Sequence, residues 1–248
     1  MFTTYEDIFE QRGRSYHDAM TRYPSARDEE FRHVLDMADV QPGDVVCDIP
    51  SGGGYLAQFV GRSVSVFHVE TSRVFTDLCR DNGIPDALLG RFDAIPLNTA
   101  SMDKAISLAA LHHVEEKDRF FREAHRVLRE NGTLVIADVR AGSAVSEFLD
   151  GFVGTHNSMG HRGYYIHPGT AAHIERCHFA VVESIAIPFR WHFESPEAMG
   201  LFCRLLFGID RANTEQVIDG LRRHVGYSID PEGCHLNWEL LFIKASKR

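Results

Sequence analysis

Two acidic residues flank a run of glycines in the first third of the chain, and these residue types at this spacing could bind a ligand. Asp48 lies in an apolar run at 45–49, residues 51–54 are Ser-Gly-Gly-Gly, and Glu70 ends a second apolar run at 64–70. Glycine lets the backbone approach a ligand closely, and an acid after the next strand can accept hydrogen bonds from ribose hydroxyls. The pattern predicts a site for a nucleoside-bearing cofactor, and a merely tight turn is the alternative.

The elements around these residues alternate between strand and helix. Apolar, β-branched runs predict strands, and amphipathic periodicity predicts helices. The expected strands are 45–49, 64–70, 88–92, 103–108 and 133–139, and the expected helices are 72–82 and 118–129. Such alternation is typical of α/β folds. We therefore expect a doubly wound, Rossmann-like, mostly parallel sheet with helices on both faces, whose strands end at one ligand-binding crevice.

The N-terminal segment is expected to be helical. Within residues 1–36, apolar residues recur at helical spacing, and Arg27, Glu29 and Arg32 fall on the opposite, polar face. We expect one domain made of four parts: a helical N-terminal extension (1–36), a cofactor-binding core (45–139), substrate-recognition or cap segments (140–235) and a closing strand (236–248).

The last hundred residues carry different signals. Four glycines within 151–163 argue against a helix interior there. Strand-like residues at 180–190 and 239–244 lie on either side of a helix that begins after Ser195. We expect these strands to supply an antiparallel edge strand near the C-terminus. The helix carries an apolar stripe that is most simply core, formed by Met199, Phe202 and Leu206.

The composition is that of an ordinary globular chain. Of 248 residues, 44% are hydrophobic and 25% are charged, which excludes a disordered or fibrous protein. The net charge of −9 makes phosphate backbones and anionic membrane surfaces poor partners. The N-terminus lacks the regions of a signal peptide, and five cysteines without a C-x-x-C pair suit a reducing compartment. We expect a cytoplasmic protein, with a homodimer left open.

Short motifs in a fixed order extend the pattern from about residue 45 to 139. They are Val-Cys-Asp-Ile-Pro-Ser-Gly-Gly-Gly at 46–54, Val-Glu at 69–70, Phe-Asp-Ala-Ile-Pro-Leu at 92–97, Met-Asp-Lys-Ala-Ile-Ser at 102–107, Leu-His-His-Val at 111–114 and Arg-Val-Leu-Arg-Glu-Asn-Gly-Thr-Leu at 126–134. In this order the chain resembles the class I S-adenosylmethionine-dependent methyltransferases, particularly the small-molecule group with a methyltransferase-11 type core. The resemblance implies S-adenosyl-L-methionine as cofactor, S-adenosyl-L-homocysteine as its product, and a small-molecule acceptor.

The resemblance also implies roles for individual residues. Asp48 and the glycine loop would hold the methionine part of the cofactor, Glu70 the ribose hydroxyls, and Asp93 the adenine amino group. The residues implied at the methionine part are Asp48, Ser51, Gly52, Gly53, Gly54 and Leu108. Glu70 is implied at the ribose, and Thr71, Asp93 and Ala94 are implied at the adenine. Tyr16 is expected to cover the bound cofactor.

One position departs from the family pattern. Pro50 stands where the family usually has glycine. Proline fixes φ near −65° and favours an extended residue before it, so the loop can form if position 50 needs no positive φ. The additional glycine at Gly53 restores part of the lost freedom. We expect Pro50 to affect loop shape and cofactor affinity more than the fold.

His112 is the candidate catalytic base. It follows the expected strand at 103–108, where oxygen methyltransferases similar to this chain place a histidine. An imidazole with a pKa near 6.5 suits proton removal at neutral pH. The alternative is that His112 and His113 only close a turn.

A glycine-rich segment with polar and aromatic residues follows the fifth expected strand and could cover a small acceptor. The residues predicted to contact the substrate are His113, His156, His161, Tyr164 and Tyr165. A mobile surface loop is the alternative. No metal is expected, because His156, His161 and His167 accompany neither an H-E-x-x-H pattern nor a cysteine pair, and Asp150 and Glu147 complete no known ligand set.

The leading hypothesis is therefore a methyltransferase acting on oxygen, nitrogen, sulfur or carbon of a small molecule. One alternative is an NAD-dependent oxidoreductase, because Gly52, Gly54 and Ala57 also fit a dinucleotide fingerprint. The other is a nucleoside-binding domain of the same fold without turnover, which Pro50 favours.

Overall fold

Eight strands form one sheet in the computed structural model, which describes residues 4–248. The strands are β1 Val45–Asp48, β2 Ser65–Glu70, β3 Leu88–Leu89, β4 Met102–Leu108, β5 Leu128–Asp138, β6 Phe179–Phe193, β7 Tyr227–Asp230 and β8 Gly233–Lys247. Their order is β3-β2-β1-β4-β5-β8-β6, with β7 beside β8. Strands β1 to β5 pair in parallel, and β8 pairs antiparallel with β5, β6 and β7. The doubly wound, mostly parallel sheet predicted from the sequence is confirmed.

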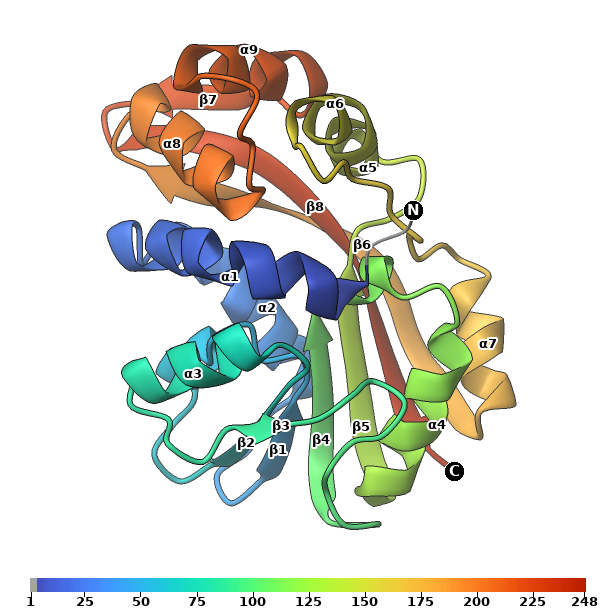
Figure 1. The fold of residues 1–248 in the computed structure, drawn as a ribbon. Coiled ribbons are helices and arrows are strands. Elements are labelled where there is room, and N and C mark those ends of the chain that lie inside the picture. The colour runs from blue at the N-terminus through green and yellow to red at the C-terminus, as the bar shows by residue number, and fades with distance from the viewer. Residues whose placement is uncertain (1–3) are drawn as a thin grey trace.

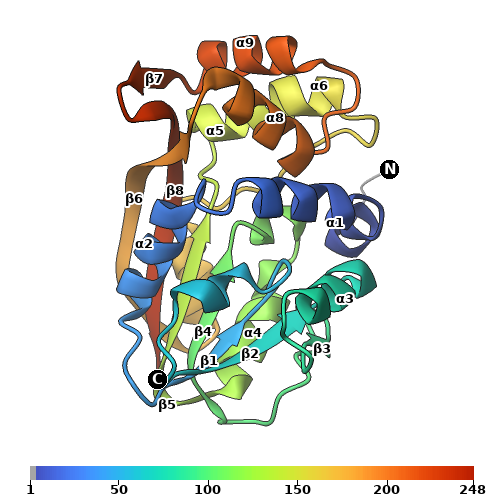
Figure 2. The same ribbon diagram turned by 90° about the vertical axis from the view of Figure 1, so that its left-hand side faces the viewer.

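Helices lie on both faces of the sheet (Figures 1 and 2). They are α1 Tyr5–Arg22, α2 Asp28–Ala38, α3 Arg73–Asp81, α4 Lys117–Val127, α5 Ala144–Glu147, α6 Gly154–His156, α7 Thr170–Arg176, α8 Pro196–Leu206 and α9 Thr214–His224, with 3-10 turns η1 Tyr55–Phe59 and η2 Leu111–His113 and a π-helical turn η3 Phe148–Val153. Side-chain caps fix several starts, such as the reciprocal bonds between Thr4 and Asp7 at α1.

Alternation along the strands divides the core into two layers. Val46 of β1 and Val135 of β5 belong to a buried cluster that includes residues of α2 and α8. Their neighbours Cys47 and Leu134 point to the opposite face, into a cluster with α4 and α7. The parallel strands are therefore covered on both sides, and ligands can reach the sheet only at its edges.

The last two long strands continue past the sheet into a second group of helices. Figures 1 and 2 show β6 and β8 extending beyond the ends of β4 and β5 to α5, α6, α8 and α9, which we call the cap. Helix α1 lies between the cap and the sheet, with contacts to α8 on one side and α3 on the other. The carboxyl ends of the parallel strands therefore face α1 and the cap.

The antiparallel pairing of the late strands at the sheet edge, expected from the sequence, is confirmed by β6 and β8. Two other local expectations differ from the structure. Gly151 and Gly154, expected to break a helix, lie in the helical run formed by α5, η3 and α6, while Gly160 and Gly163 are irregular. Arg27, assigned to a polar face, is buried with 4% exposure because Glu30 pairs with it.

The structure also bears on the environment of the chain. No helix among residues 4–248 is long and apolar enough to cross a membrane. The five cysteines are free thiols and all are buried.

Candidate functional site

A cavity lies at the carboxyl ends of β1 and β4, between the sheet, α1 and the cap. It has a volume of about 960 Å³, open solvent at its mouth included. Its lining includes Asp48, Ser51 and Gly52 from the glycine loop, Leu108, His112 and His113 from β4 and η2, Tyr16 from α1 and His161 from the segment after α6. Most of the residues predicted at the methionine part of the cofactor therefore lie in this one cavity.

Asp48 is a buried carboxylate with an unused acceptor. Its side chain is almost inaccessible, and its Oδ2 has no hydrogen-bond partner among the described residues. The Nδ1 of His68 lies 3.3 Å from that oxygen, close enough for attraction but without hydrogen-bond geometry. Burial raises the pKa of Asp48, and His68 only partly offsets this effect. A cationic or hydrogen-bonding ligand in the cavity would satisfy this carboxylate.

The glycine loop has a shape that requires glycine. Gly52, Gly53 and Gly54 all have positive φ, at 57°, 99° and 79°. A Cβ on Gly54 would also lie 2.2 Å from Ile84 Cδ1. Pro50 is absent from the positive-φ positions, so the loop accommodates a proline at this position. The helix expected after the loop is only the five-residue 3-10 turn η1.

Glu70 lies at the same edge of the sheet as Asp48 but is turned toward the backbone. Its carboxylate accepts hydrogen bonds from the N–H groups of Gly52 at 2.8 Å, Thr71 at 2.7 Å and Ser72 at 3.2 Å. The side chain is fully buried, and this burial raises its pKa to about 7. Glu70 thus ties the glycine loop to the start of α3, and ribose hydroxyls would have to share its oxygens with these three donors.

Two of the three residues predicted at the adenine line a second, adjacent pocket. Thr71 and Asp93 lie there, and Tyr5 and His113 line both hollows and stand between them. The Thr71 hydroxyl is buried without a hydrogen-bond partner among the described residues. Asp93 pairs with Arg91 at 2.8 Å, and the Ala94 N–H donates to the Arg91 carbonyl. A cofactor that contacts both groups of residues would have to displace the Tyr5 ring.

Aromatic side chains of α1 cover the crevice. The rings of Phe9 and Tyr16 lie 4.9 and 5.3 Å from the Phe75 ring of α3. The Tyr16 hydroxyl accepts a hydrogen bond from Arg27, which forms a two-pronged ion pair with Glu30. Arg27 and Glu30 line the cavity but were missed from the sequence, because helical periodicity places charged residues on a solvent face and cannot show that two of them pair.

His112 is held by a carboxylate that the sequence analysis did not single out. The Nδ1 of His112 lies 2.7 Å from Asp138 Oδ1, at the end of β5. Asp138 also accepts hydrogen bonds from the backbone N–H groups of Ala110, His112 and Val139. The acid that ends the fifth strand was a signal in the sequence, because strand ends converge at this edge. With Nδ1 bonded to Asp138, Nε2 is the ring nitrogen that remains for a ligand.

The glycine-rich segment places only some of its predicted residues at the cavity. His161 lines it, and its Nδ1 lies 3.0 Å from Asp150. The Tyr165 hydroxyl donates to the same aspartate at 2.6 Å. His156 is turned to the Phe152 carbonyl at 2.8 Å, and Tyr164 donates to Glu115 near the surface. Asp150 therefore fixes the segment so that His161, rather than His156 or Tyr164, faces the interior.

The far end of the cavity is aromatic and lies beside the cap. Trp191 of β6 and Trp238 of β8 stack with ring centroids 4.2 Å apart, and Phe207 stacks on Trp238 at 5.8 Å. All three line the cavity and were not predicted. Of the apolar stripe on α8, Leu206 reaches the cavity lining, whereas Met199 and Phe202 are fully buried in the core.

The fold and this site can be compared with known proteins. Residues 47–136 match the model of a family described as a methyltransferase domain. The match begins within β1 and ends within β5. It therefore covers the parallel strands and the glycine loop, and it leaves α1, α2 and the cap outside.

Individual proteins are similar over different extents. A 37.1 kDa protein of transposon TN4556 from Streptomyces fradiae is 30% identical over 145 residues, 55% of this chain and 41% of its own length. The tRNA (carboxymethyluridine(34)-5-O)-methyltransferase ALKBH8 of Mus musculus is 27% identical over 49% of this chain and 18% of its own length. A crystal structure from Thermotoga maritima named as a SAM-dependent methyltransferase matches with a TM-score of 0.65 at 16% identity, over 98% of this chain and all of that one. The chain thus spans less than half the length of these curated relatives.

Proposed function

We propose that this chain, whose residues 47–136 match the model of a methyltransferase-domain family, is an S-adenosylmethionine-dependent methyltransferase with a small-molecule acceptor. The observation that carries the proposal is one cavity that is lined by Asp48, whose carboxylate has an oxygen without a hydrogen-bond partner among the described residues, by His112 and by the aromatic residues Trp191, Phe207 and Trp238. One end of this cavity suits a polar cofactor, and the other suits a small apolar or aromatic molecule.

The residues around the cavity fit the cofactor in specific ways. S-adenosylmethionine, when bound, supplies an electrophilic methyl group on a sulfonium. The buried Asp48 oxygen offers an acceptor to the amino group of the methionine part, and the free Thr71 hydroxyl offers one near the adenine. Gly52 leaves the loop open toward the cavity, where a Cβ would meet only the Tyr16 hydroxyl at 3.8 Å. Cofactor binding would require the α1 aromatic residues that cover the crevice to move.

His112 would act on the acceptor. Asp138 accepts a hydrogen bond from its Nδ1, so Nε2 carries the lone pair and can take a proton from an acceptor hydroxyl or amine. The rest of the cavity contributes by orientation and by excluding water, and orientation alone can lower a barrier by roughly 7–11 kcal/mol. The buried Trp191 of β6 and Trp238 of β8 would hold the acceptor against the methyl group.

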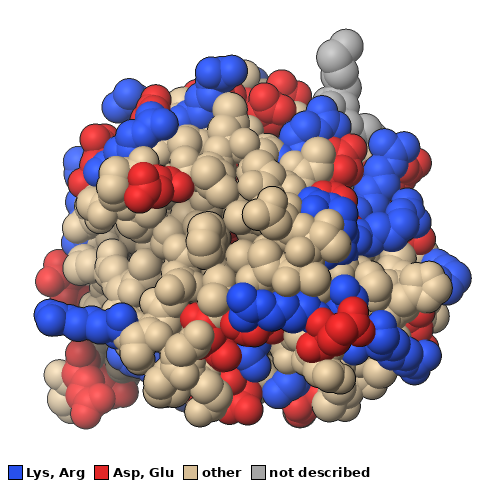
Figure 3. All heavy atoms as spheres, turned by 90° about the horizontal axis from the view of Figure 1, so that it is seen from below, with Lys and Arg blue, Asp and Glu red and all other residues tan. Residues whose placement is uncertain are grey.

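A small acceptor fits this chain better than a tRNA does, although ALKBH8 carries tRNA in its name. The cavity is bounded by α1 and the cap, and its far end consists of stacked rings. The net charge of −9 repels a phosphate backbone. Figure 3 shows one face of the molecule, on which basic and acidic side chains alternate around uncharged residues instead of forming a continuous basic surface. The buried free cysteines fit the reducing conditions of the cytoplasm.

Cofactor binding tests the first half of the proposal. S-adenosylhomocysteine at about 100 times its dissociation constant should raise the free energy of unfolding by about 2.7 kcal/mol, and thermal shift or denaturant titration would detect this. A shift with NADH and none with S-adenosylhomocysteine would instead support an oxidoreductase and overturn the proposal.

Turnover tests whether the chain transfers a methyl group to a small molecule. The chain is incubated with labelled S-adenosylmethionine and, in separate arms, a library of phenols, amines, thiols and hydroxy acids or bulk tRNA. Methyl transfer to a small molecule supports the proposal. Transfer to tRNA alone would overturn the acceptor class, and cofactor binding without transfer in any arm would favour a non-catalytic domain.

A further inference from the structure

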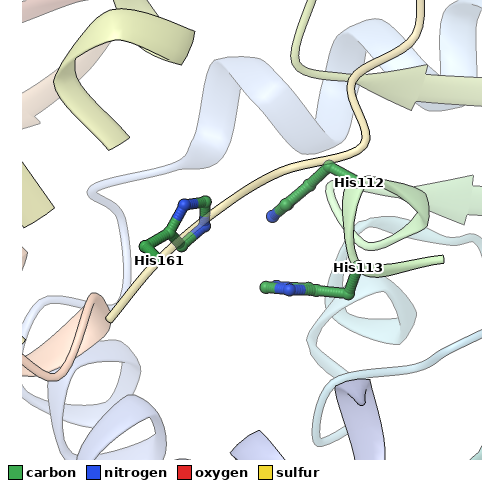
Figure 4. A group of neighbouring side chains, drawn as sticks. All are labelled: His112, His113 and His161. Carbon is green, nitrogen blue, oxygen red and sulfur yellow. The ribbon is translucent and has the colours of Figure 1, made fainter. Parts of the chain in front are cut away.

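Three histidines from two distant segments meet at the cavity wall. His112 and His113 lie in η2, and His161 lies 48 residues further along the chain, after α6. One ring nitrogen of each lies within 4.8 Å of a ring nitrogen of the other two. Figure 4 shows the three rings facing the space between them. We call these residues the histidine cluster.

Two of the three rings have a carboxylate within hydrogen-bond distance of Nδ1. The Nδ1 of His112 lies 2.7 Å from Asp138, and the Nδ1 of His161 lies 3.0 Å from Asp150. An ionised carboxylate can only accept, so each Nδ1 carries the proton and each Nε2 keeps its lone pair. In metal sites, a ligating histidine almost always donates its other ring N–H to such a carboxylate or carbonyl. The two aspartates therefore provide the outer shell of a metal site.

The cluster is largely removed from solvent. His112 is only 6% exposed, and the His161 side chain is only 7% exposed. Neutral imidazole is the form that ligates metals.

We propose that His112, His113 and His161 bind one Zn²⁺ ion, whose open position faces the cavity and takes a phenolic or enolic oxygen of the acceptor. Three histidines with an open fourth position are a known arrangement of catalytic zinc. At Zn–N distances of about 2.0–2.1 Å the ligand nitrogens would be about 3.4 Å apart, so the cluster has to contract. Gly160 and Gly163 flank His161 closely enough for its segment to move inward.

The residues around the cluster suggest the kind of ligand. An ion bound there would add positive charge beside the cavity, and an anionic oxygen of the ligand would offset part of it. The stacked rings of Trp191 and Trp238 line the same cavity and suit an aromatic or enolic molecule.

The sequence argument set a metal aside because it grouped His161 with His156 and His167, its neighbours in the chain. The fold instead brings His161 to His112 and His113. Ion binding by the cluster is independent of the proposed function, whereas the role of the ion toward the acceptor rests on it. Zinc and a proton would compete for Nε2 of His112, so activation by the metal replaces base catalysis by His112.

The first test measures metal binding by the full chain after treatment with a chelator. Co²⁺, a spectroscopic substitute for Zn²⁺, should bind at one equivalent with visible absorption bands, and Zn²⁺ should displace it. His161→Gln and His113→Gln should each lower Co²⁺ affinity by at least roughly 100-fold, and Asp150→Asn by about 10–100-fold, as changes behind a ligand do. Binding of S-adenosylhomocysteine and the melting temperature report whether each variant is folded.

His173→Gln is the matched control. His173 also pairs with an aspartate, Asp118 at 2.9 Å, but its side chain is 47% exposed and lies outside the cluster. It should leave Co²⁺ binding unchanged. Absence of stoichiometric Co²⁺ binding to the wild-type chain, or equal binding by folded His161→Gln, would overturn the proposal.

The second test addresses the ligand. Phenol should change the Co²⁺ absorption bands of the wild-type chain, and anisole, which lacks the ionisable hydroxyl, should not. An equal response to both compounds would overturn the assignment of the acceptor oxygen. Metal binding without S-adenosylhomocysteine binding would overturn the proposed function but leave the metal site standing. S-adenosylhomocysteine binding without metal binding would overturn the metal site but leave the proposed function standing.

Discussion

Two buried aspartates lie at the ends of strands in the same sheet, and they differ in their hydrogen-bond partners. Asp138, at the end of β5, accepts hydrogen bonds from His112 and from three backbone N–H groups. Asp48, at the end of β1, has His68 at 3.3 Å and an oxygen without a hydrogen bond. Burial raises the pKa of Asp48, whereas for Asp138 the effect of burial is outweighed by the neighbouring His112 and by the hydrogen bond from the Val139 N–H, and its pKa is lowered.

This difference separates a carboxylate that organises the site from one that is available to a ligand. A buried acceptor without a partner costs free energy, and a fold retains such a group where a bound molecule satisfies it. Asp138 is satisfied by the chain itself and fixes His112. We infer that Asp48 is satisfied by the cofactor, and the following predictions test this contrast.

The largest effect is expected on turnover at His112. His112→Ala should lower kcat by about 10²–10⁴-fold, because it removes either a positioned proton acceptor or, where an ion is bound, one of the ligands of that ion. The dissociation constant of S-adenosylhomocysteine should stay within about threefold, because Asp48 and the glycine loop are untouched. Steady-state kinetics and calorimetric titration measure the two quantities. Unchanged kcat would exclude His112 from catalysis, and His173→Ala serves as the control.

The next largest effect is expected on the free energy of unfolding, which should respond differently to substitution of Asp138 and of Asp48. Asp138→Asn should lower the free energy of unfolding by about 3 kcal/mol, because an amide has one acceptor oxygen for four donors and leaves buried N–H groups unsatisfied. Asp48→Asn should change it by less than about 1 kcal/mol, since it removes a buried charge that no donor satisfies. Urea denaturation without ligand measures both. Equal losses would mean that the chain satisfies the two aspartates equally.

For cofactor affinity, the substitution of Asp48 should have a larger effect than the substitution of Asp138. Asp48→Asn should weaken binding of S-adenosylhomocysteine by about 10–100-fold, because a hydrogen bond to a charged group contributes about 1.5–3 kcal/mol. Asp138→Asn should weaken it less, provided that the variant is folded at the assay temperature. Isothermal titration measures both constants. An Asp48→Asn chain that binds as tightly as the wild type would show that the unpaired oxygen does not face the cofactor.

The contrast also explains which parts of the site the sequence could predict. The glycine loop, Asp48 and Glu70 lie within 23 residues, and strand alternation alone brings them to one edge. The histidine cluster, Asp150 and the stacked tryptophans come from segments spread between residues 112 and 238, and their meeting depends on the course of β6 and β8 and on packing of the cap. Local patterns carry no information about such packing, and for that reason Trp191, Trp238 and Arg27 were missed.

Glu70 is a third buried carboxylate in this region, with backbone partners like Asp138 but a raised pKa of about 7. The titratable groups around it are Asp48, Tyr5, Tyr16 and Cys79. In the unfolded chain its pKa is near 4.5, so between these values the folded state binds more protons. Glu70 therefore stabilises the fold fully below pH 4.5, and this contribution is lost as the pH rises through 7.

The expected change is small but has a definite sign. Between pH 6 and 8 the free energy of unfolding should fall by about 1 kcal/mol on account of Glu70, as measured by urea titrations at a series of pH values. Glu70→Gln removes the titration and should flatten this part of the profile, while its single acceptor oxygen leaves one of the three backbone donors unsatisfied and lowers stability throughout. A wild-type profile that rises from pH 6 to 8 and is flattened by Glu70→Gln would mean that the backbone N–H groups outweigh burial. Glu70 would then be an ionised anchor of the glycine loop, equivalent to Asp138 and unlike Asp48.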